Sequence, residues 1–573
     1  MALDKYQRVL SSLFLGAVGL VLVGLVGRVV YINTALHPAL IRHADRQRRA
    51  SSLLPARRGM ILDSRGRVVA ASRLVPEAYV DAARVENVDA LADSLGVRLH
   101  LSAAALAERI RRLPTARFVR VGHQLEDAEA DAIRALRNPA VGLTDRDVRT
   151  YPLGESMAHV IGFVGREGRG LEGLEKTLDG HLRGRDGRRS IWVDARRRAL
   201  GMVDEPLRQP ADGGHVVLTV DSEIQRIAER AVDATLHEFD AESGVAVVVD
   251  PATGDVLALA CRPAFDANLA AAAPEERRRN RALTDPIEPG STLKPFIMYG
   301  ALEGGHVRLN DQFDCHRGEF FFGSRRIADT SPHGMLDPMG IMTVSSNIGM
   351  GMIGQRMGNT ALYQTVRRFG FGAPFESELP GAGAGRVQSL RKWTSMSAVS
   401  VAMGYEVSLT PLQLVTGFCS LVNGGRLVRP RVVRRLLHAD GSVALEVPVS
   451  ERGPRLNSEV VRHIHEMLIS VVENGTGKRA RLERFRVMGK TGTPKLSYLG
   501  RKGYESGAYQ PTFVGAAPAS DPRIAVVVTI RRPDARRGYY GGVVAAPAAA
   551  KIIDETLQYL GVPNDRETLL TGL

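Results

Sequence analysis

Three short motifs in the second half of the chain carry side chains suited to nucleophilic catalysis. Ser291 and Lys294 form an S-x-x-K motif, Ser345 and Asn347 form an S-x-N motif, and Lys490 begins a K-T-G-T segment. A buried lysine beside another cation loses proton affinity, and a neutral amine can deprotonate a serine. The chain favours arginine elsewhere, since only nine of its 76 basic residues are lysine. Lysine at these positions therefore points to proton transfer, which arginine does not perform in proteins.

The residues around Ser291 predict that it lies at the start of a helix. Pro289 and Gly290 break the preceding chain, and Pro295 falls in the first turn, where its missing N–H group is tolerated. A spacing of three residues places Ser291 and Lys294 on one helical face.

A second S-x-x-K motif, Ser389 to Lys392, is a useful comparison. It lacks a Pro-Gly opening, and no S-x-N motif lies between it and Lys490. A lone S-x-x-K is a weak signal, whereas the ordered set, with intervals of about 55 and 145 residues, is a strong one. The motif at Ser389 is therefore interpreted as a chance occurrence.

The ordered set resembles that of the class B penicillin-binding proteins, which are monofunctional transpeptidases. Further segments extend the resemblance over nearly the whole chain. Two resemble the non-catalytic domain of that family and two its FtsI-type division branch: Arg57–Gly66, Gly170–Glu175, Asn280–Asp285 and Tyr539–Pro547. Pro494 and Lys495 stand where Ala-Gln often follows K-T-G-T in the family. This difference concerns the assignment to a subfamily and not the chemistry of the site.

The resemblance implies a role for each motif residue. Ser291 is the nucleophile, Lys294 the general base, and Ser345 a proton relay toward the leaving group. Asn347 binds Lys294 and the substrate amide, and Lys490 supplies positive charge near the terminal carboxylate. The substrate-binding residues are Thr491, Gly492 and Thr493, and the N–H groups of Ser291 and Thr493 form an oxyanion hole.

The resemblance also implies the substrate and the partners. The enzyme is expected to attack the D-Ala-D-Ala end of a peptidoglycan stem peptide and to pass the acyl group to an amine of a neighbouring stem. It needs no metal and no cofactor, and β-lactams are expected to be covalent inhibitors. An FtsW-like glycosyltransferase of the SEDS type and divisome proteins are the expected protein partners.

Three alternatives remain open. The preference for a role in division over a role in elongation rests on the resemblance alone. A D,D-carboxypeptidase or β-lactamase would use the same site, but neither needs a non-catalytic domain of roughly 150 residues. A membrane β-lactam sensor would need a substantial cytoplasmic part, and only about nine residues precede the first apolar segment.

The N-terminus predicts a membrane anchor. Leu10 to Gly27 is an uncharged, mostly apolar run of 18 residues, and its extension to Ile32 is long enough to cross a bilayer. No A-x-A cleavage pattern follows, which favours an uncleaved anchor over a signal peptide. The positive-inside rule would place the bulk of the protein in the cytoplasm, but long domains translocate largely regardless of charge. Because the expected substrate lies outside the cytoplasmic membrane, we expect a single-pass anchor with an extracytoplasmic (periplasmic) catalytic domain.

The predicted fold class is α+β, with a mostly antiparallel catalytic sheet flanked by helices. Apolar runs predict paired strands at 245–249 and 256–260 and again at 512–516 and 524–530, so one sheet joins early and late segments. A helix is expected over 222–239, helices over 83–137 and 171–182, a strand at 159–164 and a loop at 183–189. The predicted boundaries are 1–9 for a cytoplasmic tail, 10–32 for the anchor, 33–205 for a non-catalytic pedestal and 215–565 for the transpeptidase domain.

Composition excludes several other function classes. The net charge is +14, but aromatic residues make up only 5% and no basic stripe carries interleaved aromatics, so no nucleic acid partner is expected. Cys261, Cys315 and Cys419 are too few and too scattered for a zinc site or a disulfide scaffold. A G-x-G-x-x-G segment at 168–173 lacks the βαβ units of a dinucleotide fold. The segment 475–478 fails the P-loop pattern.

Overall fold

The computed structural model describes residues 2–36, 49–121, 125–193, 199–374, 377–498 and 503–568. The chain divides into two compact units. One unit combines residues 1–56 with 184–212, and the other combines 57–183 with 213–573.

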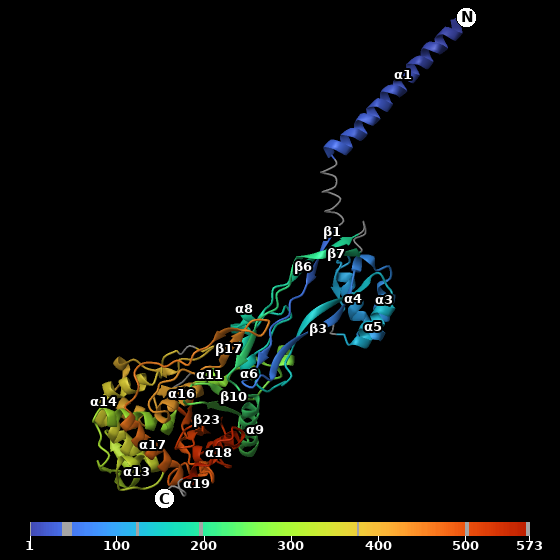
Figure 1. The fold of residues 1–573 in the computed structure, drawn as a ribbon. Coiled ribbons are helices and arrows are strands. Elements are labelled where there is room, and N and C mark those ends of the chain that lie inside the picture. Colours follow the sequence, from blue (N-terminus) through green and yellow to red (C-terminus); the bar gives the residue numbers. More distant parts are fainter. Residues whose placement is uncertain are drawn as a thin grey trace. The chain divides into compact units, whose positions relative to one another are not determined.

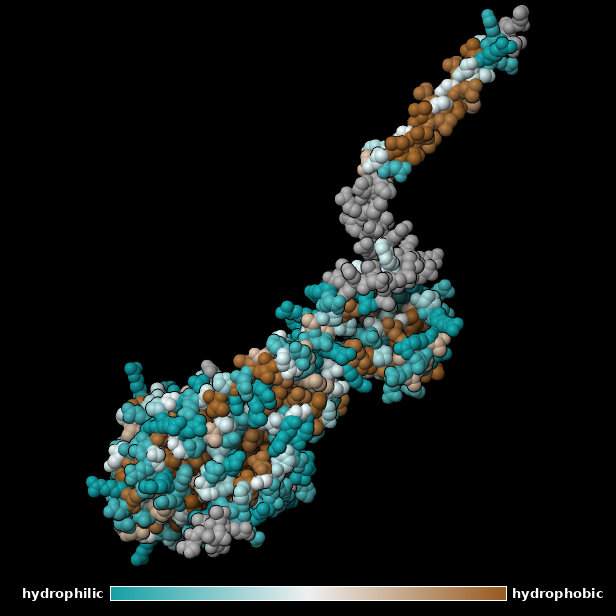
Figure 2. All heavy atoms as spheres, viewed as in Figure 1, coloured by the Kyte–Doolittle hydropathy of each residue, from teal (hydrophilic) through white to brown (hydrophobic). Residues whose placement is uncertain are grey.

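The first unit contains a long apolar helix and a small sheet. Helix α1 spans Ala2–Tyr31 and continues into a π-helical turn, Ile32–Leu36. The stretch Lys5–Ala35 contains an 18-residue window with a mean hydropathy of 2.5 and is long and apolar enough to cross a membrane. Figure 2 shows its exposed hydrophobic side chains along the helix. The sheet is antiparallel in the order β1-β6-β7, with strands Arg49–Leu54, Gly187–Val193 and Ala199–Arg208. The loop expected at 183–189 is therefore wrong from Gly187 onward.

The second unit contains a five-stranded antiparallel sheet, which the sequence predicted as the catalytic sheet. Its order is β10-β9-β23-β22-β19, so the early hairpin lies beside the late one, as the sequence predicted. The strands are β9 Ser243–Val249, β10 Val256–Arg262, β19 Met488–Gly492, β22 Thr512–Ala517 and β23 Ile524–Arg531.

Helices cover both faces of this sheet because its strands are apolar on both sides. Along β9, Val245, Val247 and Val249 belong to one buried cluster, while Ala246 and Val248 belong to another. The second cluster contains residues of the helices α9 and α18, which pack on that face, and α16 packs on the opposite face. These helices span Ser222–Phe239, Gly541–Tyr559 and Pro411–Val422, and α9 matches the predicted range (Figure 1).

A second sheet links early strands of the chain to strands β8, β17 and β18. Its order is β18-β17-β8-β2-β3-β4, and β5 pairs with the long strand β3. Strands β2 and β3 pair antiparallel across a turn that contains Asp63. The strands are β2 Ile61–Leu62, β3 Val68–Val80, β4 Val119–Arg120, β5 Val141–Thr150, β8 His215–Leu218, β17 Val433–Leu437 and β18 Val443–Glu446.

The helices expected between residues 83 and 137 are present and pack beside β3 and β5 (Figure 1). Side-chain oxygens of Asn87 and Ser102 accept hydrogen bonds from backbone N–H groups in the first turns of α3 and α4, which explains where both helices begin. The helices are α3 Val88–Leu99, α4 Ala103–Arg112 and α5 Asp127–Ala135.

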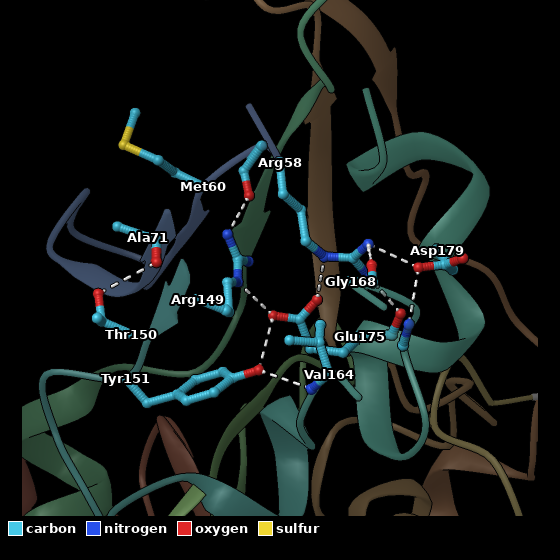
Figure 3. A network of polar contacts seen from close by, with 12 residues as sticks. Arg58, Met60, Ala71, Arg149, Thr150, Tyr151, Val164, Gly168, Glu175 and Asp179 are labelled. Carbon is cyan, nitrogen blue, oxygen red and sulfur yellow. Dashed lines mark hydrogen bonds and ion pairs between the residues drawn. The ribbon is translucent and has the colours of Figure 1, made fainter. Parts of the chain in front are cut away.

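A buried ion-pair network fixes the segment that contains the G-x-G-x-x-G pattern (Figure 3). The Glu175 carboxylate is fully buried and accepts from Arg58 Nε and Arg149 Nε, each at 2.7 Å. Arg58 also donates to Asp179 at 2.6 Å and to the carbonyl oxygen of Gly168 at 3.2 Å. This network stabilises the turn in which the glycines lie, and only two short helices of five and four residues follow it, where a dinucleotide fold would need a long helix.

Two predicted elements of this region are wrong in detail. The apolar run from His159 to Val164 forms a short helix, α6 Ala158–Ile161, which ends at Gly162 with φ 74°. A short apolar run that is buried on all sides has no period that separates strand from helix. The helix expected from Leu171 to Leu182 is divided into α7 Gly173–Thr177 and α8 Asp179–Leu182.

Candidate active site

Ser291 lies in a single 3₁₀ turn, Gly290–Leu293, which continues into helix α12, Lys294–Glu303. Pro295 occupies the first helical turn, as the sequence predicted. Gly290 adopts φ +51° and donates its N–H group to the carbonyl oxygen of Gly404 at 3.1 Å. A Cβ on Gly404 would lie 1.9 Å from the carbonyl oxygen of Gly290, so this approach requires glycine. The turn before Ser291 is thus held in place by the Gly404 loop.

Lys294 is fully buried and its amine faces the S-x-N motif. Its Nζ donates to the Ser345 carbonyl oxygen at 2.7 Å, to the Ser346 carbonyl oxygen at 3.2 Å and to Asn347 Oδ1 at 2.9 Å. The Ser345 hydroxyl oxygen lies 3.3 Å from the same nitrogen. The structure gives the Ser291 hydroxyl no hydrogen bond within the described residues, and catalytic hydrogen bonds often form only when substrate is bound.

The S-x-N motif joins two helices, α13 Pro338–Val344 and α14 Asn347–Arg368. Ser345 ends α13 in the left-handed conformation, with φ 61° and ψ 41°, and the Ser346 hydroxyl accepts from the Gly349 N–H group at the start of α14. A non-glycine residue in this conformation is strained, and such strain persists only where the surroundings enforce it. Here it directs Ser345 Oγ toward both lysines.

Asp329 organises this junction, although no motif marks it. Its carboxylate accepts from Ser346 Oγ at 2.6 Å, from the Asn347 N–H group, and from the Ile348 N–H group at 3.1 Å. A carboxylate at the first turn of a helix satisfies N–H groups that have no partner within the helix. Asp329 therefore fixes the backbone from which Asn347 reaches Lys294.

Lys490, Thr491 and Gly492 lie at the end of β19, which pairs with β22. Lys490 is fully buried, and its Nζ donates to Ser345 Oγ at 2.8 Å. Thr491 Oγ1 lies 2.7 Å from Thr476 Oγ1, and Thr493 Oγ1 accepts from the Gly541 N–H group at 2.9 Å. The three motifs therefore meet at the Ser345 hydroxyl.

Burial changes the protonation of both lysines. Loss of solvation lowers the pKa of Lys294 to about 7, and the nearby Asp329 carboxylate acts in the opposite direction. Burial, together with the charge of Lys294, holds the pKa of Lys490 well below its usual range. Two ammonium groups that share one hydroxyl in a buried site repel each other, so one of them is readily neutral near pH 7.

A cavity of about 760 Å³ opens over these groups. Its lining includes every predicted site residue except the two buried lysines: Ser291, Ser345, Asn347, Thr491, Gly492 and Thr493. Four tyrosines also line it: Tyr405, Tyr509, Tyr539 and Tyr540. The volume is in the usual range of ligand sites. The arrangement provides a nucleophile and two buried amines of lowered proton affinity beside one cavity.

The comparison motif lies elsewhere. Ser389 and Lys392 are exposed; Ser389 precedes a three-residue 3₁₀ turn, Leu390–Lys392, and Lys392 ends it, and neither residue lines this cavity. The segment dismissed as a failed phosphate loop does line it, through Gly475, Thr476 and Lys478. Sequence reasoning noticed this pattern but tested it only against nucleotide binding.

The three cysteines are buried free thiols. Within the described residues, no group of three or more His, Cys, Asp or Glu side chains is placed to hold a metal ion.

Two family descriptions match the chain. Residues 244–554 match the penicillin binding protein transpeptidase domain, and residues 53–218 match the penicillin-binding protein dimerisation domain.

Curated relatives match over nearly the full length. The chain is 32% identical over 560 residues to the probable peptidoglycan D,D-transpeptidase PenA of Neisseria meningitidis, covering 96% of this chain and 93% of the relative. It is 32% identical over 568 residues to the peptidoglycan D,D-transpeptidase FtsI of Escherichia coli K12, covering 98% and 93%. Among solved structures, penicillin binding protein 3 of Mycobacterium tuberculosis in complex with aztreonam has a TM-score of 0.69. That comparison has 26% identity and covers 90% of this chain and 98% of that one.

Proposed function

The chain belongs to the class B penicillin-binding proteins and is a serine D,D-transpeptidase of peptidoglycan synthesis, and we propose that it cross-links stem peptides during septal wall synthesis. The curated relatives do not separate division from other roles, because their names include FtsI and a stage V sporulation protein. The septal role is supported by the segments Asn280–Asp285 and Tyr539–Pro547, which resemble the division branch.

Acylation begins at Ser291. Neutral Lys294 takes the proton from Ser291 Oγ, which attacks the carbonyl carbon of the penultimate D-Ala. The C–N bond to the terminal D-Ala then breaks, and that nitrogen leaves after receiving a proton through Ser345. The backbone N–H groups of Ser291 and Thr493, which both line the cavity, stabilise the negative charge on the carbonyl oxygen.

The contacts of Ser345 support its role as the relay. Its hydroxyl lies 3.3 Å from Lys294 Nζ and 2.8 Å from Lys490 Nζ, so a proton can pass from one amine to the leaving nitrogen through a single hydroxyl. Asn347 keeps the Lys294 amine in place through its Oδ1. Its amide group also remains close to the cavity, where it can bind the substrate backbone.

Positive charge and the edge strand β19 bind the peptide. Lys490 and the hydroxyl of Thr491 face the terminal carboxylate. The backbone at Gly492 and Thr493 pairs with the extended peptide, as when a strand is added to a sheet.

The observation that carries the proposal is the approach of both lysines to Ser345 beneath a cavity lined by Ser291. The test is covalent labelling of the full-length protein with a fluorescent penicillin, followed by peptide mapping. We expect the adduct on the peptide that contains Ser291. Ser291→Ala should lose all labelling, and Ser389→Ala should label like the parent. An adduct on Ser389 would refute the assignment.

The proposed topology places the catalytic domain outside the cytoplasmic membrane. We propose a tail at 1–9, an anchor at 10–32, a pedestal at 33–205 and a transpeptidase domain at 215–565. The apolar helix Lys5–Ala35 supports the anchor. Alkaline phosphatase, which folds only in an oxidising compartment, should be active when fused at the C-terminus. An inactive fusion with an active cytoplasmic reporter at the same position would reverse the orientation.

The proposed partners are an FtsW-like SEDS glycosyltransferase, which would supply the glycan strand, and divisome proteins. A fluorescent protein fused to the N-terminal tail tests the septal role. Septal enrichment that depends on the division machinery supports it, whereas an even distribution along the lateral wall would favour elongation.

A further inference from the structure

Two arginines face each other on the small sheet of the first unit. Arg188 of β6 pairs across the strands with Arg208 of β7, so their side chains lie on the same face of the sheet. Both are exposed, and neither forms an ion pair with any residue that the structure describes. Arg208 donates to the backbone carbonyl oxygen of Asp186, whose carboxylate accepts from the Ala56 N–H group instead. Like charges directly opposite each other destabilise a sheet, and an anion bound beside both would remove this cost.

The same face also carries apolar side chains. On its other side, Arg188 pairs with Leu53 of β1, which is 58% exposed. Trp192 lies four residues after Arg188 along β6, and the alternation of side chains in a strand returns it to this face. We call Leu53, Arg188, Trp192 and Arg208 the Arg188 face. Arginine beside leucine and tryptophan is the combination that favours the boundary between lipid headgroups and acyl chains.

The Arg188 face lies a short distance along the chain from the apolar helix. Near its C-terminal end α1 carries Arg28 and Tyr31, with the guanidinium carbon 5.6 Å from the ring centroid. Basic and aromatic residues in this position mark the level of the lipid headgroups. Twelve residues separate Leu36, where the π-helical turn ends, from Arg49, where β1 begins. An extended chain of that length spans at most about 45 Å, so the sheet remains near the membrane surface.

Outside its apolar helix, the first unit is basic. Residues 33–56 and 184–212 contain eleven arginines and six acidic residues, which leaves an excess of five positive charges. Such a cluster beside a membrane helix is attracted to anionic lipids. The planar guanidinium group also matches the geometry of a phosphate, to which it can donate two parallel hydrogen bonds. The charge of this unit therefore complements a surface of lipid phosphates.

We propose that the Arg188 face binds the headgroup phosphates of anionic phospholipids, through Arg188 and Arg208, and so rests on the surface of the membrane that α1 enters. Leu53 and Trp192 then contact the boundary between headgroups and acyl chains. The inference is independent of the transpeptidase reaction. It is also independent of the orientation of the anchor, because the sheet is close to the membrane on whichever side it lies.

The test uses tryptophan fluorescence, because the chain has two tryptophans and one of them lies on the Arg188 face. Trp393 belongs to the second unit, so Trp393→Phe leaves Trp192 as the single emitter and serves as the parent. The full-length parent is reconstituted in vesicles of phosphatidylcholine, or of phosphatidylcholine with an equal amount of phosphatidylglycerol. Both kinds of vesicle contain the same fraction of a phosphatidylcholine that is spin-labelled on its headgroup. The quenching of Trp192 by this lipid then reports how close the face lies to the headgroups.

In the parent, quenching should be stronger in the vesicles with phosphatidylglycerol, and added salt should remove the difference. Arg188→Ser with Arg208→Ser should lower the ratio of membrane-bound to free faces about twenty-five-fold, at about fivefold for each cation near an anionic surface. Quenching should then be the same in both kinds of vesicle. Arg188→Lys with Arg208→Lys retains the charge and should retain the lipid dependence. The matched control, Arg391→Ser with Arg523→Ser, removes two exposed arginines of the second unit that form no ion pair with described residues, and it should behave like the parent.

Labelling of Ser291 by fluorescent penicillin shows that each variant is folded, and it should be the same in all of them. Equal quenching of the parent in the two kinds of vesicle would refute the proposal. A serine double variant that keeps the lipid dependence would refute it as well. If quenching is independent of lipid but the parent binds isolated cell-wall polymer through Arg188 and Arg208, the face belongs to the wall and the proposal is wrong.

Discussion

The pH dependence of acylation tests the role of Lys294 directly. Burial lowers its pKa from 10.5 to about 7, so about 9% of the amines are neutral at pH 6 and about 91% at pH 8. If Lys294 is the base, the acylation rate follows this fraction. The rate should therefore rise about tenfold from pH 6 to pH 8 and then level off. An unshifted lysine would give about a hundredfold rise over the same interval, which would continue beyond pH 9.

The assay is the second-order rate constant for fluorescent penicillin between pH 5.5 and 9.5. Lys294→Arg retains the positive charge but releases no proton, so it should lower the rate on the order of a hundredfold or more at pH 8. Lys392→Arg should behave like the parent. A hundredfold rise that continues past pH 9, or near-parental acylation by folded Lys294→Arg, would refute the reasoning.

The same shift has a stability consequence of known sign. Because the folded pKa of Lys294 is lower than the unfolded one, the unfolded chain binds the proton more strongly between pH 7 and 10.5. The contribution of this residue to stability therefore rises over that window, by about 5 kcal/mol at ~1.36 kcal/mol per pKa unit. It is lost as pH falls toward 7, and Lys294→Arg should abolish this part of the pH dependence.

Three further changes test other parts of the structure. Asp329→Asn removes the carboxylate that opposes the fall in the pKa of Lys294. The midpoint of the pH profile of acylation should therefore move below pH 7. An unchanged midpoint in a folded variant would contradict this. Glu175→Gln leaves two buried arginines without their shared carboxylate. The free energy of unfolding, measured by denaturant titration, should fall by about 3–5 kcal/mol. A change below about 1 kcal/mol would show that the network contributes little to stability. Gly404→Ala places a Cβ 1.9 Å from the Gly290 carbonyl oxygen, so the turn that carries Ser291 must shift. The rate of penicillin acylation at Ser291 should fall, while the melting temperature should change no more than in other core variants. An acylation rate equal to that of the parent would show that the loop moves without disturbing Ser291.

The sequence determined the features that local patterns encode. The apolar run after Lys5 has the length and composition of a membrane anchor, and the helix Ser222–Phe239 and the hairpin at 245–260 follow from local periodicity and turn residues. The order of the three motifs identified the family and the candidate residues. Local periodicity did not distinguish helix from strand in the short apolar run that begins at His159. This run forms a helix where a strand was expected.

Only the tertiary structure decided how the candidate groups meet. Ser345 and Lys490 are 145 residues apart, and helix α17, Ser458–Glu473, packs against both α13 and β19, the elements that carry them. Asp329 has no motif, and Thr476 and Lys478 matched only a failed one, so their places beside the site come from the fold alone. Contacts between distant segments are set by burial and by the geometry of packed elements, which no local window of sequence contains. The same physics sets the pKa of Lys294, because desolvation depends on everything that surrounds the amine.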